Sequence, residues 1–174
     1  MSKLILEGFM GCGKTTYGKA LADELGIFFM DTDKSIEQMA GMSVSDIFAR
    51  RGEADFRDME SALLTRIAEQ PRKYPRDMIL SIGGGMPVKL ENRINLSMIG
   101  RVVYLRATEE LLVSRLQGDN ADRPMIAGDD PAAKIHKLLE EREAIYLDAA
   151  NVIVDIDGKS DEAIVRELER YIIV

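Results

Sequence analysis

The chain has 174 residues, 46% of them hydrophobic and 30% charged, with a net charge of −7. This length predicts one globular domain, residues 1–174, and the negative charge argues against a nucleic-acid partner. The single cysteine allows no internal disulfide, and no cysteine–histidine cluster suits zinc. Neither a signal segment nor a membrane-length apolar run is visible, so we expect a cytoplasmic protein without membrane contact. We also expect it to be a monomer.

The first element is a short apolar run, Lys3–Glu7, that predicts a buried strand. Residues 8–15 then read Gly-Phe-Met-Gly-Cys-Gly-Lys-Thr, the complete G-x-x-x-x-G-K-T pattern of a phosphate-binding loop. Glycines lack a Cβ, so the backbone can aim several N–H groups into one concavity around phosphate oxygens. Lys14 is expected beside the β- and γ-phosphates, and the Thr15 hydroxyl is a candidate ligand of Mg²⁺. The sequence therefore predicts a nucleoside triphosphate site.

A helix is predicted directly after this loop, because apolar residues recur at helical spacing from Thr15 to Leu25. Strand, loop and helix in this order are the setting that the pattern requires, and the helix adds its positive dipole end to the phosphate site. We interpret Cys12 as a small filler within the loop, with a redox switch as the alternative.

The rest of the chain alternates between strands and helices. Further apolar runs predict strands at 27–31, 78–82, 101–105 and 152–154. Helical spacing predicts helices at 33–40, 43–50, 53–69, 88–97, 108–116, 132–148 and 161–172. Near-continuous apolar strands joined by helices indicate an α/β fold, with a five-stranded parallel sheet covered by helices on both faces.

Ligands of such sheets bind at the carboxyl ends of the strands, and the second strand ends in Asp31-Thr32-Asp33. If the extended backbone continues, both carboxylates lie on one side, where one would hold the metal and the other deprotonate an acceptor hydroxyl. The alternative is that Asp33 only caps the next helix. Asp155, which closes the last strand, has no obvious Thr15 partner, so we assign the metal to Asp31.

The third strand is followed by Gly83-Gly84-Gly85, whose backbone N–H groups a ligand could approach closely. The alternative is a flexible turn before Pro87. In a helical stretch, Arg57 and Glu60 are three residues apart, so Glu60 could hold the guanidinium while it grips a carboxylate bidentately. The alternative for this pair is a solvated ion pair, and Arg142 carries the same ambiguity.

Residues 117–131 are polar and show no periodicity; Arg115 precedes them and Arg123 lies within them. A loop that carries arginine over a phosphate site would act as a mobile lid, at about 115–131. Its closure would exclude water, which competes with the acceptor for the γ-phosphate. The alternative is a plain surface connection.

Together these motifs resemble those of the shikimate kinases, which belong to the nucleoside-monophosphate-kinase-like P-loop folds. The resemblance covers nearly the whole chain and is carried, in order, by Gly8–Thr15, Asp31-Thr32-Asp33, Ser45-Asp46-Ile47-Phe48, Phe56-Arg57-x-x-Glu60, Gly83-Gly84-Gly85, Arg123-Pro124 and Arg142-x-x-x-Tyr146. The phosphate loop alone is generic. The D-T-D, F-R-x-x-E and G-G-G elements together are specific to this family.

The resemblance implies a three-layer P-loop kinase that transfers the γ-phosphoryl group of ATP, with Mg²⁺, to the 3-hydroxyl of shikimate in aromatic amino-acid biosynthesis. It implies that Asp33 is the base, that Lys14 and Arg123 are catalytic residues at the phosphates, and that Thr15 and Asp31 hold the metal. The implied nucleotide contacts are Gly11, Cys12, Gly13, Lys14, Thr15, Thr16, Arg115, Arg123 and Lys159. The implied shikimate contacts, several from acceptor-binding helices at about 33–61, are Asp33, Phe48, Phe56, Arg57, Gly83, Gly84, Gly85 and Arg142.

One departure from the family concerns Lys159, which stands where an arginine often lies beside adenine; lysine stacks less well on a base. Two other functions remain open from the sequence. A gluconate or nucleotide kinase would share the phosphate loop and lid but would not need the combined D-T-D, F-R-x-x-E and G-G-G set. A non-catalytic regulatory domain is disfavoured because Lys14, Asp33 and Arg57 are all present.

Overall fold

The computed structural model describes residues 3–116, 125–126 and 130–172. Within these ranges one five-stranded sheet is formed by β1 (Lys3–Glu7), β2 (Phe28–Asp31), β3 (Met78–Ser81), β4 (Arg101–Arg106) and β5 (Val152–Asp155). The strand order is β2-β3-β1-β4-β5, and every neighbouring pair is parallel. The predicted parallel sheet is therefore confirmed, with the first strand at its centre.

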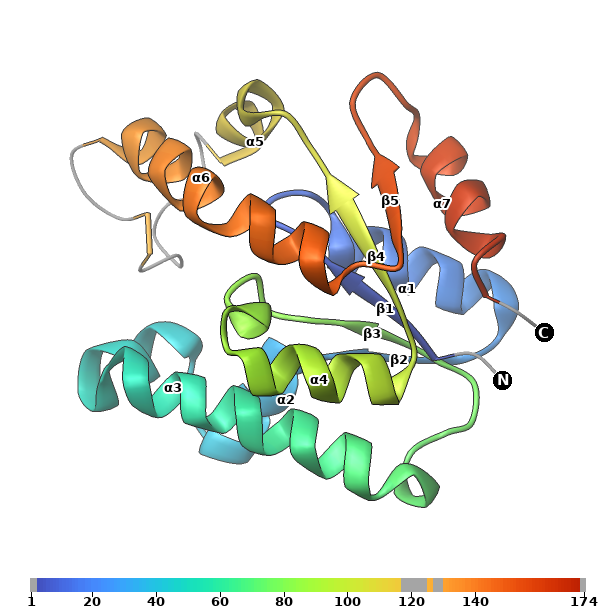
Figure 1. Ribbon diagram of the computed structural model, residues 1–174, viewed down its shortest axis with the longest axis horizontal. Coiled ribbons are helices and arrows are strands. Elements are labelled where there is room, and N and C mark those ends of the chain that lie inside the picture. The colour runs from blue at the N-terminus through green and yellow to red at the C-terminus, as the bar shows by residue number, and fades with distance from the viewer. Residues whose placement is uncertain (1–2, 117–124, 127–129, 173–174) are drawn as a thin grey trace.

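Helices cover both faces of the sheet, as predicted. They are α1 (Lys14–Leu25), α2 (Thr32–Ala40), α3 (Val44–Glu69), α4 (Leu90–Ile99), α5 (Glu109–Leu116), α6 (Pro131–Ala149) and α7 (Asp161–Glu169), with short 3₁₀ turns at Pro71–Lys73 and Met86–Val88. Figure 1 shows α3 and α4 on one side of the sheet and α1 and α7 on the other, which gives the expected three layers.

The central strand explains why its sequence reads as a continuous apolar run. Leu4 and Leu6 pack into one hydrophobic cluster, whereas Ile5 between them packs into a second cluster on the opposite face. Successive side chains of a strand point to opposite faces. A strand that is buried on both faces therefore needs apolar residues at successive positions, without the alternation of a half-exposed strand.

The helix α3 contains the two helical segments that the sequence predicted. Gly52 between them has a non-helical backbone, with φ 86° and ψ 166°, and the segment bends there. Such a positive φ is costly for residues with a Cβ, which explains the glycine. The rings of Phe48 and Phe56, one on each side of the bend, lie 5.1 Å apart.

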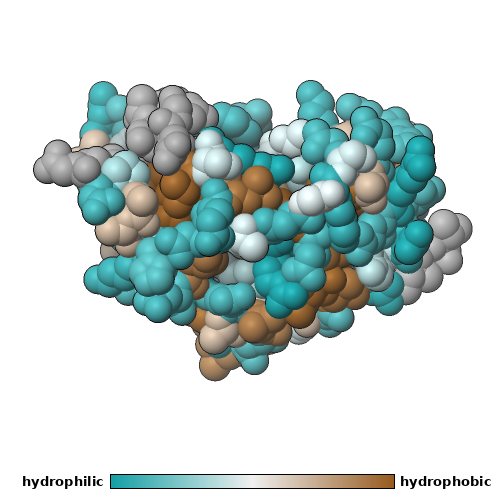
Figure 2. Space-filling model, turned by 90° about the horizontal axis from the view of Figure 1, so that it is seen from above, coloured by the Kyte–Doolittle hydropathy of each residue, from teal (hydrophilic) through white to brown (hydrophobic). Residues whose placement is uncertain are grey.

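Hydrophilic side chains dominate the face of the molecule seen in Figure 2, and hydrophobic atoms reach the surface there in separate patches. Among the helices that the structure describes, none combines the length and the apolar character needed to cross a lipid bilayer.

Candidate active site

A pocket of about 600 Å³ lies at the carboxyl ends of β2 and β3, against the start of α1. It brings together most of the residues that the sequence predicted for the site. Its lining includes Gly11, Gly13, Lys14, Thr15, Thr16, Asp31, Asp33, Phe48, Phe56, Arg57, Gly83, Gly84, Gly85, Arg115 and Arg142. Residues more than a hundred positions apart in the chain thus face one cavity.

The phosphate loop has the backbone that its glycines predict. Gly8, Gly11 and Gly13 all have positive φ, and a Cβ on Gly8 would lie 2.6 Å from the carbonyl oxygen of Leu105. The Lys14 ammonium donates hydrogen bonds to the carbonyl oxygens of Gly8 and Phe9, at 2.9 and 3.0 Å. The loop therefore curls around its own lysine and keeps this charge at one end of the pocket.

The two residues expected to hold the metal are in contact. The Thr15 hydroxyl donates to Asp31 Oδ2 at 2.7 Å, and the Ser81 hydroxyl lies 3.3 Å from Thr15. Hydroxyl and carboxylate oxygens are hard ligands that suit Mg²⁺, which in such sites takes few protein ligands and completes its shell with phosphates and water. The residues present therefore fit this ion.

The expectation that extended backbone continues through Asp33 is wrong. The helix α2 begins at Thr32, and Asp31 caps it, because Asp31 Oδ1 accepts a hydrogen bond from the Lys34 N–H. Asp33 thus sits in the first helical turn rather than at the cap. Both carboxylates still face the pocket, because the helix starts at its rim.

Asp33 carries an oxygen that the fold leaves free. Its Oδ1 is buried and has no hydrogen-bond partner among the described residues. Burial raises the pKa of the Asp33 carboxyl to about 6, and the negative charge of Asp31 adds to this effect. At neutral pH the group is mostly ionised yet can readily accept a proton, which suits a general base.

The guanidinium of Arg57 is held by carboxylates on its own helix. Its Nη1 donates to Glu60 Oε2 at 2.7 Å, and its Nε and Nη2 donate to Glu53 Oε1 at 3.2 and 2.9 Å. Glu60 is fully buried, and burial raises its pKa to about 7, against the opposing charge of Arg57. The Glu60 contact agrees with the sequence prediction, whereas Glu53 was missed although its spacing of four residues could have signalled it.

The glycines after β3 serve a packing purpose that the sequence did not reveal. A Cβ on Gly83 would lie 2.6 Å from Asp33 Oδ1 and 2.7 Å from Glu60 Oε1, and one on Gly85 would overlap the Arg57 guanidinium. The Gly83 N–H is also already used, since it donates to the Thr32 hydroxyl at 3.0 Å. The turn therefore leaves room for charged side chains as well as for a ligand.

The helix α6 supplies a second arginine to the pocket. Arg142 is only 7% exposed, so its charge lies inside the cavity rather than on the surface. One helical turn later, the buried Tyr146 hydroxyl donates to the Gly84 carbonyl oxygen at 2.5 Å. This bond joins α6 to the glycine turn, so Arg142 faces the same part of the pocket as Arg57.

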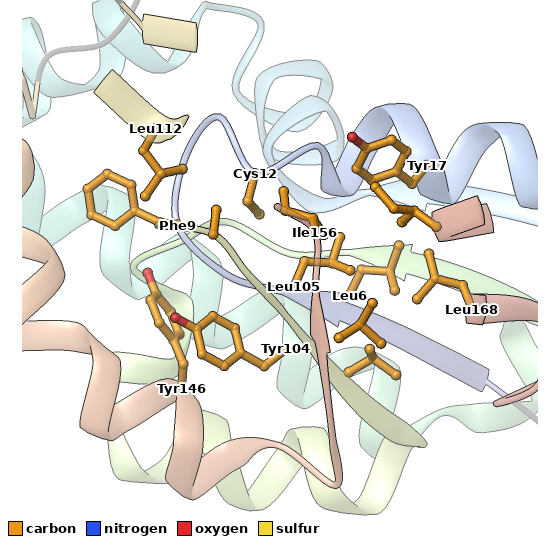
Figure 3. Close-up of a cluster of buried hydrophobic side chains, with 14 of the residues drawn as sticks. Leu6, Phe9, Cys12, Tyr17, Tyr104, Leu105, Leu112, Tyr146, Ile156 and Leu168 are labelled. Atoms are coloured by element: carbon orange, nitrogen blue, oxygen red, sulfur yellow. The ribbon is translucent and has the colours of Figure 1, made fainter. Parts of the chain in front are cut away.

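Two predicted nucleotide contacts, Cys12 and Lys159, do not line the pocket, and a third lies outside the described residues. The Cys12 side chain is buried among hydrophobic residues beneath the loop (Figure 3), so a contact from this residue would have to come from its backbone. Lys159 is paired with Glu167 at 2.5 Å. Arg123, with most of the predicted lid, lies outside the described residues.

Some residues near the site were not predicted to act there. Tyr17 and Asp161 line the pocket. The sequence indicated only that Tyr17 lies on a helix and that Asp161 begins one. Glu7, at the end of β1, is fully buried with no hydrogen-bond partner for either oxygen among the described residues. Burial raises its pKa to about 8. A glutamate closing an apolar strand was the only signal for it.

Comparison with known proteins points to one family. A family model described as shikimate kinase matches residues 10–172. The shikimate kinase of Caldanaerobacter subterraneus subsp. tengcongensis is 37% identical over 170 residues, which cover 98% of this chain and 95% of the relative. The structure of the shikimate kinase from Acinetobacter baumannii in complex with shikimate matches with a TM-score of 0.89 at 30% identity, over 98% of this chain and 92% of its own. The shikimate kinase from Bacteroides thetaiotaomicron matches with a TM-score of 0.83 at 31% identity, over 97% of each chain.

Proposed function

The chain belongs to the shikimate kinase family, which phosphorylates the 3-hydroxyl of shikimate with ATP and Mg²⁺, and we propose that the pocket described above is where it does so. One observation carries this proposal. The carboxylate of Asp33 and the guanidinium of Arg57 share a cavity with a phosphate loop. An acceptor that carries both a hydroxyl and a carboxylate can therefore meet the nucleotide there.

On the acceptor side, Arg57 and Arg142 bind the carboxylate of shikimate. A guanidinium presents paired N–H donors that match the two oxygens of a carboxylate. Glu60 and Glu53 fix Arg57 in place, so little conformational freedom is lost when the substrate binds. Phe48 and Phe56 provide an apolar wall for the ring, and the glycine turn lets it approach the backbone closely.

Asp33 is the base in this assignment. Its carboxylate accepts the proton of the 3-hydroxyl as the hydroxyl oxygen attacks the γ-phosphorus, and the bond from that phosphorus to the oxygen retained by ADP breaks. The negative charge that moves onto ADP is stabilised by Lys14. Thr15 and Asp31 hold Mg²⁺, which supplies charge neutralisation at the phosphates. The contact of Arg123 with the phosphates is also part of the proposal, and it rests on the family resemblance alone.

The remaining parts of the assignment concern the protein as a whole. Its substrates are small molecules, and the contact of Arg115 with adenine is part of the proposal. That residues 1–174 form a single domain, that the chain is a monomer and that it works in the cytoplasm also stay proposals. They rest on length, charge and the two hydrophobic clusters that pack on opposite faces of one sheet.

The test is ADP release from Mg·ATP by the purified protein, with shikimate, gluconate and AMP offered separately. Turnover with shikimate alone is expected, because the pocket places arginines for a carboxylate beside the base. Turnover with AMP or gluconate instead would mean that the acceptor side has been assigned wrongly. ATP binding without turnover on any acceptor would favour the regulatory alternative.

A further inference from the structure

One end of the pocket holds three side chains that come from different helices. Tyr17 belongs to α1, Arg115 to α5 and Asp161 to the first turn of α7, and all three line the cavity. Arg115 is exposed, whereas Tyr17 is only 2% exposed. The group is separate from the acceptor side, where Asp33 and Arg57 lie.

Arg115 is fixed at two points. Its Nη2 donates to the Tyr17 hydroxyl at 3.1 Å, and its Nη1 donates to the carbonyl oxygen of Gly11 at 3.2 Å. One contact is with the first helix and the other with the phosphate loop itself. A long side chain on the surface thereby acquires a defined position relative to the loop that binds the phosphates.

The Tyr17 hydroxyl is positioned by the core rather than by solvent. Its ring packs in the hydrophobic cluster (Figure 3). Gly13 lies directly against the ring, since a Cβ there would collide with it. Tyr17 is thus held between the core and the phosphate loop.

The hydroxyl also has a partner on its other side. Burial raises the pKa of the Tyr17 phenol, and a hydrogen bond to Asp161 adds to the rise, while Arg115 opposes it. The phenol therefore stays protonated and accepts the hydrogen bond from Arg115, with the Asp161 carboxylate acting on it from α7. The three side chains thus bring α5, α1 and α7 together at one end of the pocket.

We propose that Tyr17 is a positioning residue for the nucleotide, because its hydroxyl holds the Arg115 guanidinium where the base of ATP binds. The inference rests on the proposed function, in which Arg115 contacts adenine. An arginine that is already fixed loses less conformational entropy when it packs on a base, so the contact strengthens nucleotide binding. Shikimate binding is unaffected, because its arginines lie elsewhere in the pocket. The alternative is that Tyr17 is only a core residue.

The first test is Tyr17→Phe, which keeps the ring and removes the hydroxyl. We expect calorimetry to give an ADP dissociation constant about three- to tenfold higher, the scale of one lost hydrogen bond. The dissociation constant of inorganic tripolyphosphate, which has no base, and the KM for shikimate should stay within about twofold. The matched control is Tyr104→Phe, which removes a buried hydroxyl of the same cluster outside the pocket and should leave ADP affinity unchanged.

The second test places the same change in an Arg115→Ala background. If Tyr17 acts through Arg115, Tyr17→Phe should weaken ADP binding no further there. Equal weakening of ADP and tripolyphosphate binding by Tyr17→Phe would overturn the proposal, and so would additive effects of the two changes. Unchanged ADP affinity in Tyr17→Phe, beside weakened ADP binding in Arg115→Ala, would overturn it as well. If Arg115→Ala itself leaves ADP affinity intact while shikimate turnover persists, the adenine contact of Arg115 is wrong and this inference falls with it, although the phosphorylation assignment stands.

Discussion

At the scale of single residues, three buried acids of this chain face three different surroundings. Asp33 lines the pocket and has one oxygen without a partner, Glu60 is paired with Arg57, and Glu7 has no partner among the described residues. Burial raises the pKa of all three, yet only Asp33 combines an accessible cavity with the proposed acceptor position. Position, rather than pKa, therefore separates the candidate base from the other two.

The role of Asp33 is tested by Asp33→Asn, which keeps the size of the side chain and removes the base. We expect turnover to fall by about 10²-fold or more, the usual scale for a positioned base, while the affinity for ATP is retained. Steady-state kinetics and ADP calorimetry measure the two quantities. Near-normal turnover would remove Asp33 from this role.

The role of Arg57 is tested by Arg57→Ala and Arg57→Lys. Because the guanidinium contacts the substrate before as well as in the transition state, the alanine variant should raise the KM for shikimate more than it lowers kcat. Lysine should not restore the KM, since an ammonium lacks the paired donors. An unchanged KM for shikimate in both variants would contradict the carboxylate contact.

Glu7 gives a prediction on pH and stability. Its pKa rises from an ordinary 4.5 to about 8 in the folded protein, so the folded state holds a proton that the unfolded state releases. Its contribution to stability is thus complete below pH 4.5 and is lost as the pH rises to about 8. Glu7→Gln removes this dependence. The free energy of unfolding of Glu7→Gln minus that of the wild type should therefore be larger at pH 8 than at pH 5, by roughly 1 kcal/mol or more.

Urea denaturation at the two pH values measures this difference, with Glu24→Gln on the exposed face of α1 as the control. The control should show the same offset from wild type at both pH values. An offset for Glu7→Gln that does not change with pH would mean that Glu7 is ionised in the folded protein.

At the scale of elements, the strands, helices and phosphate loop were predictable because each carries a local pattern. The start of α2 was not, since Asp31 and Asp33 both suit a helix cap. In the structure Asp31 is the cap, and the first residue of the helix takes part in a distant contact, in which the Thr32 hydroxyl accepts a hydrogen bond from the Gly83 N–H. The close packing around Gly83 and Gly85 could not be predicted either, because a glycine triplet does not indicate which distant side chains will pack against it.

The glycine turn after β3 yields the prediction for this scale. In Gly85→Ala the new methyl group would occupy the place of the Arg57 guanidinium, which must then move. We expect the KM for shikimate to rise about tenfold, since a displaced guanidinium loses its paired hydrogen bonds, while ADP affinity stays unchanged. A change in ADP affinity instead of the shikimate KM would place the effect of this turn on the nucleotide side.

At the scale of the whole molecule, one sheet joins two hydrophobic clusters. Leu6 on β1 belongs to one cluster and Leu80 on the neighbouring β3 to the other, and both side chains are fully buried. Neither cluster can open without exposing the shared strands. This arrangement favours unfolding as one unit, which is what a single domain requires.

Leu6→Ala and Leu80→Ala test this unity. Each should lower the free energy of unfolding by about 2–5 kcal/mol, the range for a buried leucine. Circular dichroism and tyrosine fluorescence should report one transition that moves as a whole in both variants. Two separated transitions in either variant would show that the faces of the sheet unfold independently.

The hydrogen bonds of Lys14 have a consequence for the choice among anions. Its ammonium already donates to two carbonyl oxygens of its own loop, so only its third N–H, which has the Cys12 sulfur at 3.8 Å, is open to an incoming phosphate oxygen. A lone inorganic phosphate gains little from that single contact. A polyphosphate that also reaches the loop N–H groups and the start of α1 gains several contacts at once. We therefore expect the loop to bind polyphosphates in preference to inorganic phosphate.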